Sequence, residues 1–369
     1  MDRGGHAAAP AEMSVVEKKY STRAVRDLGR LGVEYAAVTA HLASRASRIG
    51  LAVALVVAPS LALPETIEVR ADAVSLSEAD PSLRSVGALE FRGGLRLSSP
   101  DARFGGWSGL HVSDDGAELT AIGDEGHWLT ARIEYDGQGQ LAGLADATLG
   151  PLHGEDGAPL AVKTAQDAES LARLPDGAWL VGFEHWHRLR VYRGREHPLA
   201  GRPTTFTSPP DLERAPSNGG LEALAAVPDG RLVALSEEFV ENGLLAGWVG
   251  RDGRWERLHY RASGAPVPSD MTALPSGDLL VLERSYAPLV GNTIRVRLVP
   301  ATRIAPGALL EGRLLAELKR PLTVDNFEGI ATRRNERGET LVYLLSDDNH
   351  NPLQRTLLLM FALDTSRVR

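Results

Sequence analysis

The 369-residue sequence predicts an all-β protein: a single β-propeller with six blades, or five, that follows an N-terminal extension. A hairpin pattern with acidic ends recurs five times, and its copies begin near residues 109, 169, 222, 270 and 328. The intervals of 48 to 60 residues suit four short strands and their loops, which is the length of a propeller blade. A pair of β-sandwiches with long hairpins is the competing fold, and the regular repeat argues against it.

The extension, residues 1–64, contains a candidate secretory signal. Two arginines precede the apolar run 49–58, and small residues lie at the −3 and −1 positions of a cleavage point near Ala62. This arrangement is typical of a signal peptide, whereas the run is short for a membrane-spanning helix. We therefore expect an exported protein, periplasmic or secreted. An uncleaved signal anchor and a true start at Met13 are the alternatives.

The propeller domain is expected to cover residues 65–369, where short apolar or alternating runs are typical of strands. The one helical candidate there is Ala316–Lys319. The terminal segments Ile67–Leu97 and Thr356–Leu363 lack the acidic motif, so we expect them to share a sixth blade that covers the edge strands. The predicted strands are 67–74, 88–97, 119–122, 179–183, 188–192, 232–235, 247–249, 279–282, 293–299, 341–345 and 356–363.

Each hairpin copy carries an acidic or polar pair placed symmetrically about its glycine turn. Asp229 and Gly230, for example, lie halfway between Glu222 and Glu237. Residues equidistant from a hairpin turn face each other at its open end, about 5 Å apart. We therefore expect all five pairs on one rim of the central channel. The other pairs are Ser108 with Asp124, Glu169 with Glu184, Asp270 with Glu283 and Glu328 with Asp347.

Composition excludes several classes of function. The chain has 48 Asp and Glu against 40 Lys and Arg, a formal net charge of −8, so it lacks the basic surface of a nucleic-acid-binding protein. The absence of cysteine excludes disulfides, thiolate metal sites and a cysteine nucleophile. Ser108 lies in no strand-to-helix elbow of the kind that serine hydrolases use, and no phosphate loop or dinucleotide fingerprint is present.

The acidic rim indicates a divalent cation, with calcium as the preferred ion, because clustered carboxylates raise one another's pKa or recruit a cation, and calcium takes six to eight oxygen ligands. Asn218, Asn326 and Asn349 are either neutral ligands or ordinary turn residues. His185 and His187 offer a transition-metal alternative without a third ligand. The candidate metal ligands are Glu169, Glu222, Asp270, Glu328, Asp347 and Asp348.

Cationic side chains flank the same hairpin ends, which indicates a small anionic or ester substrate. Because Arg284 directly follows Glu283, ion pairing within the rim is the competing interpretation. The candidate substrate-binding residues are Arg284, Arg355, Lys163 and Ser108, and the candidate catalytic residues are His127, His350 and Asp124.

The motifs GWSGL, DAESLA, GFEHWHR, NGGLEALA, DNFEGIA and SDDN with QRTLLL resemble the phytase-like family of exported bacterial proteins, described as "esterase-like activity of phytase". The resemblance covers about residues 85–363 and implies a β-propeller, export and hydrolysis of phosphate or other esters with calcium. The DADDPA-type acidic signature of β-propeller phytases is absent. The matching positions are Ser108, Asp124, Glu125, Glu169, Glu184, Glu222, Glu283, Arg284, Glu328, Asp347, Asp348, Asn349 and Arg355.

Two classes of function follow. The first is an exported, metal-dependent ester hydrolase that acts on a phosphoric monoester at the channel mouth, with a calcium-dependent lactonase-like hydrolase as its enzymatic rival. The second is a non-catalytic periplasmic propeller that binds a ligand or a protein. In either case we expect a monomer that binds no nucleic acid and has no membrane contact beyond a possible uncleaved anchor.

Overall fold

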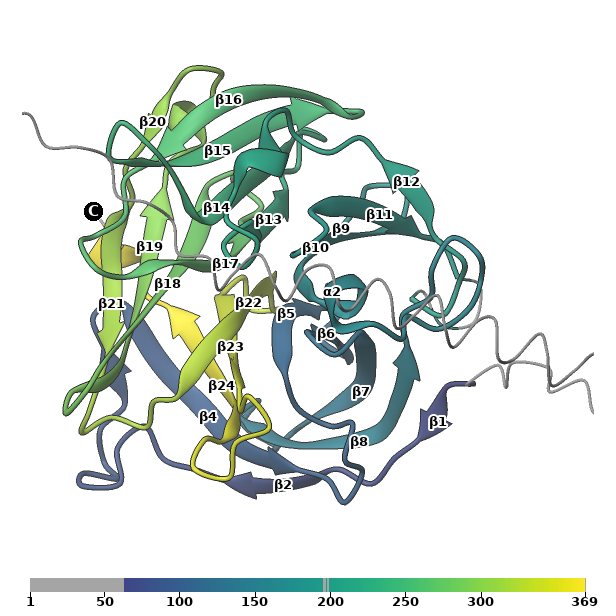
Figure 1. Cartoon of the computed structure of the whole chain (residues 1–369). Coiled ribbons are helices and arrows are strands. Elements are labelled where there is room, and N and C mark those ends of the chain that lie inside the picture. The colour runs from purple at the N-terminus through teal and green to yellow at the C-terminus, as the bar shows by residue number, and fades with distance from the viewer. Residues whose placement is uncertain (1–62, 195–196, 198, 369) are drawn as a thin grey trace, which may run out of the picture. The chain divides into compact units, whose positions relative to one another are not determined.

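The computed structural model describes residues 63–194, 197 and 199–368, and the candidate signal lies outside this part of the chain. Among the described residues, no helix has the length and apolar character needed to cross a membrane. The described chain forms a β-propeller of five blades, each an antiparallel sheet apart from one short parallel pairing in the third blade (Figure 1). The predicted fold class is therefore confirmed, with the smaller of the two expected blade numbers.

Successive hairpins of the chain supply the inner strands of successive blades. The first blade contains β1 (Glu65–Thr66), β5 (Trp107–Val112), β6 (Glu118–Gly123), β7 (His127–Tyr135) and β8 (Leu141–Pro151). The second contains β9 (Ala168–Arg173), β10 (Trp179–Phe183), β11 (Arg188–Tyr192) and β12 (Thr204–Phe206). The third contains β13 (Leu221–Ala226), β14 (Leu232–Glu241), β15 (Leu244–Arg251), β16 (Arg254–Tyr260) and β20 (Leu309–Leu310).

The fourth blade contains β17 (Val267–Ala273), β18 (Leu279–Ala287), β19 (Gly291–Val299) and β21 (Arg313–Leu318). The fifth contains β2 (Arg70–Ala73), β3 (Ser85–Val86), β4 (Leu89–Ser98), β22 (Asn326–Arg334), β23 (Thr340–Asp347) and β24 (Thr356–Leu363). The described helical segments are the single turn α2 (Lys163–Gln166) and the 3₁₀ turns Leu212–Arg214, Ala301–Arg303 and Thr365–Val368.

The first strand of every repeated hairpin is the innermost strand of its blade. β5, β9, β13, β17 and β22 each contact the next, and β22 contacts β5, so they form a closed ring around the axis (Figure 1). Every hairpin turns at a glycine whose φ lies between 76° and 87°, a conformation that residues with a Cβ rarely adopt. These glycines are Gly116, Gly177, Gly230, Gly277 and Gly338.

The two terminal segments close the ring together, but they do so inside the fifth blade and form no sixth. β24 pairs on one side with β23, from the last hairpin, and on the other side with β4. β2 then pairs with the outer edge of β4. The last hairpin supplies only inner strands, so the N-terminal segment supplies the outer ones.

The expected helix Ala316–Lys319 is wrong, because this segment falls largely in β21, the outer strand of the fourth blade, which pairs with β19. Leu315, Ala316 and Leu318 of β21 are buried. They belong to the apolar cluster between the fourth and fifth blades. A short apolar run of this kind does not by itself distinguish a strand from a helix.

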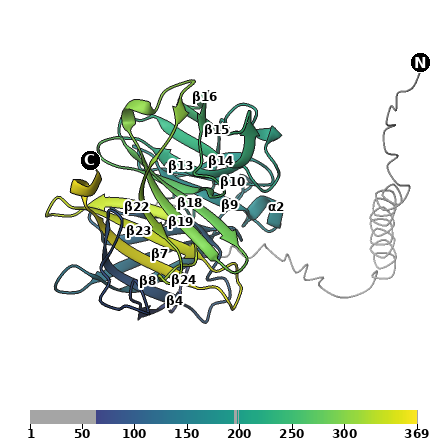
Figure 2. The ribbon, with the colours of Figure 1, turned by 90° about the vertical axis from the view of Figure 1, so that its left-hand side faces the viewer.

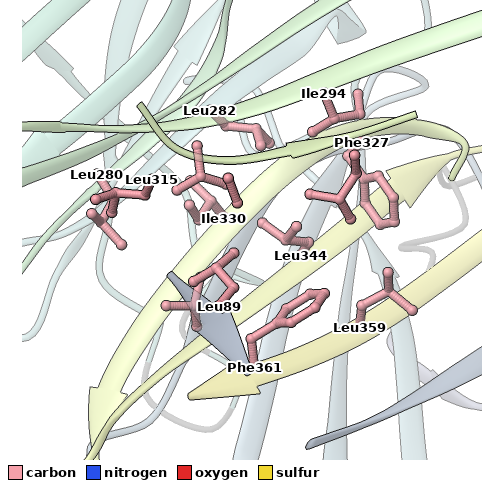
Figure 3. Packing of buried hydrophobic residues seen from close by; sticks show 14 of the residues in the cluster. Leu89, Leu280, Leu282, Ile294, Leu315, Phe327, Ile330, Leu344, Leu359 and Phe361 are labelled. Atoms are coloured by element: carbon pink, nitrogen blue, oxygen red, sulfur yellow. The ribbon is translucent and has the colours of Figure 1, made fainter. Parts of the chain in front are cut away.

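The core consists of apolar layers between neighbouring blades. In the layer between the fourth and fifth blades, Leu282 and Ile294 pack in one cluster with Phe327 and Leu344 (Figure 3). All four side chains are fully or almost fully buried, and such burial stabilises by roughly 1.5–3 kcal/mol for each large apolar side chain. This packing fixes the inner strands rigidly around the axis.

Candidate functional site

Each innermost strand carries a β-bulge at an equivalent position. The hairpin register shifts at Ser108, Glu169, Glu222, Ser269 and Glu328, leaving each of these residues unpaired. A bulge re-aims the side chain of its unpaired residue and is frequent beside active sites. All of these residues except Ser269 line a cavity of about 1130 Å³ at the axis. Ser269 is buried, and its Oγ donates to the carbonyl of Phe327 at 3.2 Å.

A second ring of residues faces the same cavity from the second strand of each hairpin. On the first strand, the residue that precedes the bulge pairs with a residue of the second strand, and each member of the ring is the next residue along that second strand. All five members line the cavity. Four are carboxylates, whereas the fourth blade supplies an arginine. The members are Asp124, Glu184, Glu237, Arg284 and Asp347.

The second blade brings three carboxylates together. Asp167, Glu169 and Glu184 each offer an oxygen, and these oxygens lie within 4.8 Å of one another. Asp167 was not among the predicted ligands, although it opens the second hairpin copy. It is 3% exposed, and its Oδ2 has no hydrogen-bond partner in the described part of the chain. Nε2 of His185 lies 3.2 Å from this Oδ2.

The lining of the cavity is strongly acidic, because it contains ten carboxylates and only four cationic side chains. Burial, with the charges of Glu328 and Asp167 next, raises the pKa of Glu169 well above its ordinary value. Burial raises the pKa of Glu237 to about 7, although Arg284 acts in the opposite direction. Burial and the charge of Glu328 raise the pKa of Asp347 to about 8. Several of these carboxyl groups therefore hold protons near neutral pH unless a bound cation displaces the protons.

Arg284 bridges two blades across the cavity wall. Its Nη2 lies 3.1 Å from Oε1 of Glu328 and 3.2 Å from Oε1 of Glu237. Burial disfavours the guanidinium charge, but the surrounding carboxylates outweigh burial and raise its pKa, so Arg284 is cationic. The ion pair expected within the rim is therefore present, with these two partners, and Nε is left without a hydrogen-bond partner in the described structure.

Lys163 and Arg355 also line the cavity, and both are paired. α2 places Nζ of Lys163 2.7 Å from Oδ2 of Asp124 and 2.7 Å from Oδ1 of Asp167. Arg355 lies 3.2 Å from Oδ2 of Asp325. The side view places α2 on the face that is turned toward the viewer in Figure 1 (Figure 2). Asn218, Asn326 and Asn349 line the same cavity, and Nδ2 of Asn326 donates to Glu328 at 2.8 Å.

Asp270, a predicted metal ligand, does not line this cavity. It follows the bulge of the fourth blade, so its side chain meets the next blade, where Oδ2 accepts from the backbone N–H of Ile330 at 2.8 Å. Oδ1 accepts from the N–H of Met271 at 2.8 Å. Its symmetric partner Glu283 is fully buried and accepts from the hydroxyl of Tyr260 in β16, a strand of the third blade, at 2.7 Å. Asp270 and Glu283 therefore both hold strands of neighbouring blades together.

Replacing Asp270 with alanine is expected to lower the free energy of unfolding by about 2–4 kcal/mol, because two buried N–H groups lose their acceptor. Thermal unfolding measures the loss. Calorimetric titration of the folded variant with calcium is expected to give the wild-type affinity. A tenfold weaker affinity would place Asp270 among the metal ligands after all.

Three other predicted site residues lie outside the cavity lining. Asp348 accepts from the N–H of His350 at 3.1 Å and from Thr356 Oγ1 at 2.9 Å, which shapes the loop after β23. His350 lies 3.5 Å from Glu125. Burial lowers the pKa of His127, at the start of β7. No histidine is among the described residues that line the cavity.

His185 and His187 lie in the turn between β10 and β11, not on a strand edge, and they face different partners. His187 Nε2 lies 3.0 Å from the carbonyl of Pro216, whereas His185 turns toward Asp167 with a positive φ of 52°.

The fold and the cavity together define a five-bladed propeller whose innermost strands line an acidic cavity at the axis. The chain belongs to the phytase-like family, since the family model described as "Esterase-like activity of phytase" matches residues 102–350. That description names a hydrolytic activity, and it agrees with the resemblance carried by the sequence motifs. No protein of curated function matches the sequence.

Similar solved structures include other propellers at low similarity. A gluconolactonase from Xanthomonas campestris is 12% identical with a TM-score of 0.39, and the match covers 79% of this chain and 90% of that one. A putative gluconolactonase is 10% identical with a TM-score of 0.40, over 81% and 96%. A virginiamycin B lyase from Staphylococcus aureus is 11% identical with a TM-score of 0.38, over 79% and 99%. At these identities and TM-scores, the substrates and residue roles of those proteins are not assigned to this chain.

Proposed function

We propose that the protein is a divalent-cation-dependent hydrolase of ester bonds that acts in the axial cavity. The observation that carries this proposal is the carboxylate cluster Asp167, Glu169 and Glu184, with oxygens within 4.8 Å of one another. Arg284 faces the same cavity from two blades away. A cation site and a buried guanidinium on one cavity are a suitable pair for polarising an ester and stabilising developing negative charge.

The residues present fit a hard divalent cation. All three clustered side chains offer carboxylate oxygens. Oδ2 of Asp167 accepts no hydrogen bond in the described chain, lies 3.2 Å from Nε2 of His185 and supplies one ligand atom. Glu222, whose pKa is raised by burial and by the charges of Glu169 and Glu184, lines the same cavity, as does Asn218. Calcium accepts such oxygen-only sets. When bound, the cation would polarise the ester and lower the pKa of a coordinated water.

The chain's own groups supply the remaining roles. Arg284 would hold the negative charge of the substrate, with Glu237 and Glu328 fixing its orientation. Asp347, with its pKa raised by burial to about 8, holds a proton at neutral pH and would donate it to the leaving group. We do not assign this role to His127 or His350, because neither lines the cavity.

The substrate class we propose first is a phosphoric monoester, whose charge the cation and Arg284 would offset. The second is a lactone or carboxylic ester, which carries less charge than a phosphoric monoester. Ten carboxylates and four cationic side chains line the cavity, and three of the cations, Lys163, Arg284 and Arg355, are already paired with carboxylates. A dianion would meet this excess of negative charge wherever the cation does not screen it.

A hydrolysis screen tests both classes. The purified protein would be assayed with p-nitrophenyl phosphate, phytate, p-nitrophenyl acetate and simple lactones, with calcium and then with a chelator. We expect turnover of one class that chelation abolishes and calcium restores. If chelation lowers the melting temperature while every substrate stays inert, the protein is a cation-stabilised binding propeller.

Replacing Arg284 with methionine is expected to lower kcat/KM by about 100-fold, because the guanidinium is the cavity's buried counter-charge for an anion. Steady-state kinetics measures the change, and Arg284→Lys is expected to recover part of it by restoring the charge without the planar fork. Calcium affinity is expected to stay the same or to increase, since a neighbouring positive charge is lost. Full activity in Arg284→Met would remove this residue from the site.

We also propose that the protein is exported, supported by the positively charged, apolar and small-residue pattern that ends near Ala62. N-terminal sequencing of the mature protein from a cell-envelope or medium fraction tests this. A mature chain that starts near Leu63 is expected, and an intact Met1 or Met13 in the cytoplasmic fraction would contradict it.

A further inference from the structure

A layer of apolar side chains crosses the axis behind the acidic cavity. It is formed by the residue two positions after each bulge, and every member is at most 5% exposed. On the far side lies a second cavity of about 470 Å³ that all five members line. No described residue lines both cavities. The members are Leu110, Leu171, Leu224, Met271 and Ile330.

The wall of the second cavity is made of small side chains with one cation. Four positions after each bulge, the inner strands carry Val112, Arg173, Ala226, Ala273 and Thr332, and all of them line the cavity. The alanines leave the space open. The arginine comes from the second blade, and it is the one charged member of these five inner-strand residues.

Arg173 lies in a stack of rings. Its guanidinium carbon is 4.5 Å from the centroid of the Trp179 ring, and the edge of the His111 ring packs against Trp179 with centroids 4.8 Å apart. Arg173 has no ion pair or side-chain hydrogen bond within the described chain, and Trp179 Nε1 also has no hydrogen-bond partner there. Burial lowers the pKa of His111 to about 4, so this histidine is neutral at neutral pH. Burial lowers the pKa of Arg173, and the charges of Glu118 and Asp176 act in the opposite direction. The stack therefore presents a guanidinium that has acidic neighbours but no direct ion-pair partner in the described chain.

We propose that this second cavity binds a small monocarboxylate with an apolar body. The carboxylate would pair with the guanidinium of Arg173, which offers parallel N–H donors of matching geometry. The body would lie on the apolar layer formed by Leu110 and its four equivalents. A volume of about 470 Å³ lies in the range of small-molecule sites.

Two exposed carboxylates at the same cavity define the charge of the ligand further. Asp114 and Glu118 line it, and neither forms an ion pair with Arg173. They would repel any anion, and a dianion or a phosphate ester more strongly than a monoanion, so a single carboxylate held by Arg173 is the anion that the cavity opposes least. The site is thus chemically distinct from the acidic cavity.

Calorimetric titration of the wild-type protein with benzoate, and with its neutral isostere benzamide, tests the proposal. We expect one saturable benzoate site and at least tenfold weaker binding of benzamide. The affinity is expected to be the same with calcium and with a chelator, because the apolar layer separates the two cavities. No saturable benzoate binding, equal binding of benzamide, or dependence on calcium would overturn the proposal.

Variants locate the site. Arg173→Met is expected to weaken benzoate binding at least tenfold, whereas the matched control Arg261→Met, an exposed arginine paired with Glu311, leaves it unchanged. Glu118→Gln is expected to strengthen it, because a like charge is removed. Melting curves establish that each variant is folded. Unchanged binding in folded Arg173→Met, or unchanged or weaker binding in Glu118→Gln, would contradict the assignment.

Discussion

Replacing Glu169 with glutamine is expected to weaken calcium binding by at least 100-fold and to abolish calcium-dependent hydrolysis. Glu169 is the bulge residue of the second blade, and it shares the cluster with Asp167 and Glu184. Removing one of three anionic ligands removes both a donor oxygen and much of the attraction for a divalent ion. Calorimetric titration with calcium measures the affinity directly, without reference to any substrate.

The same variant is expected to be more stable than the wild type when no cation is present. Burial and neighbouring charges raise the pKa of Glu169, which means that its ionised form destabilises the empty site. Calcium at 100 times its dissociation constant stabilises the wild type by about 2.7 kcal/mol, and this gain should vanish in Glu169→Gln. Glu238→Gln, an exposed glutamate outside the cavity lining, is the matched control. Wild-type calcium affinity in Glu169→Gln would exclude the cluster as the cation site.

The stability of the cation-free protein is expected to fall as the pH rises from about 4 to about 8. Burial raises the pKa of Glu237 to about 7 and that of Asp347 to about 8, so the folded state binds more protons in this interval than the unfolded chain does. The stability they contribute is complete below the unfolded-state pKa values and is lost as the pH passes the folded-state values. A pKa that is higher by one in the folded state than in the unfolded state corresponds to about 1.4 kcal/mol, so the combined loss is several kcal/mol.

Melting curves in chelator at pH 5 and pH 8.5 measure this effect, and a decrease of about 10 °C is expected. Calcium is expected to reverse most of the decrease at pH 8.5, where the carboxylates are free of protons, and to have little effect at pH 5. Asp347→Asn should reduce the pH dependence, since its amide does not titrate. A cation-free protein that is equally stable at both pH values would contradict the crowding of buried carboxylates in the cavity.

Much of the fold could be predicted from local sequence. Trp179–Phe183, Arg188–Tyr192 and Thr356–Leu363 coincide with β10, β11 and β24, because their apolar runs end at clear turn signals. The number of blades could not be predicted in this way. β24 and β4 pair although almost the whole domain separates them in the chain, and no local pattern predicts such a contact.

The symmetry of the hairpins predicted that the paired residues gather around one cavity, and this holds for every hairpin except that of the fourth blade. Asp270 and Glu283 are symmetric about their turn, yet the bulge is at Ser269 and the cavity residue is Arg284. A count of eight residues back from the turn glycine reaches the bulge residue in the first four hairpins, Ser108, Glu169, Glu222 and Ser269, whereas in the fifth hairpin Glu328 lies ten residues before Gly338. This spacing was a usable signal. In the fourth blade this spacing identifies Ser269 as the bulge residue and distinguishes it from the adjacent Asp270.

The repeat interval, the glycine turns and the gathering of carboxylates at one end of each hairpin were determined by sequence alone, because each depends on spacing within a few dozen residues. Closure of the ring determined the remaining features of the described chain. The five hairpins form five blades, and Asp270 bonds to the next blade instead of lining the acidic cavity. His127 and His350 lie outside the lining of that cavity, and Arg173, which has no ion pair, lines the second cavity beyond the apolar layer. Which side chains converge on the axis depends on the packing of all five inner strands against one another, and that packing exists only in the closed ring.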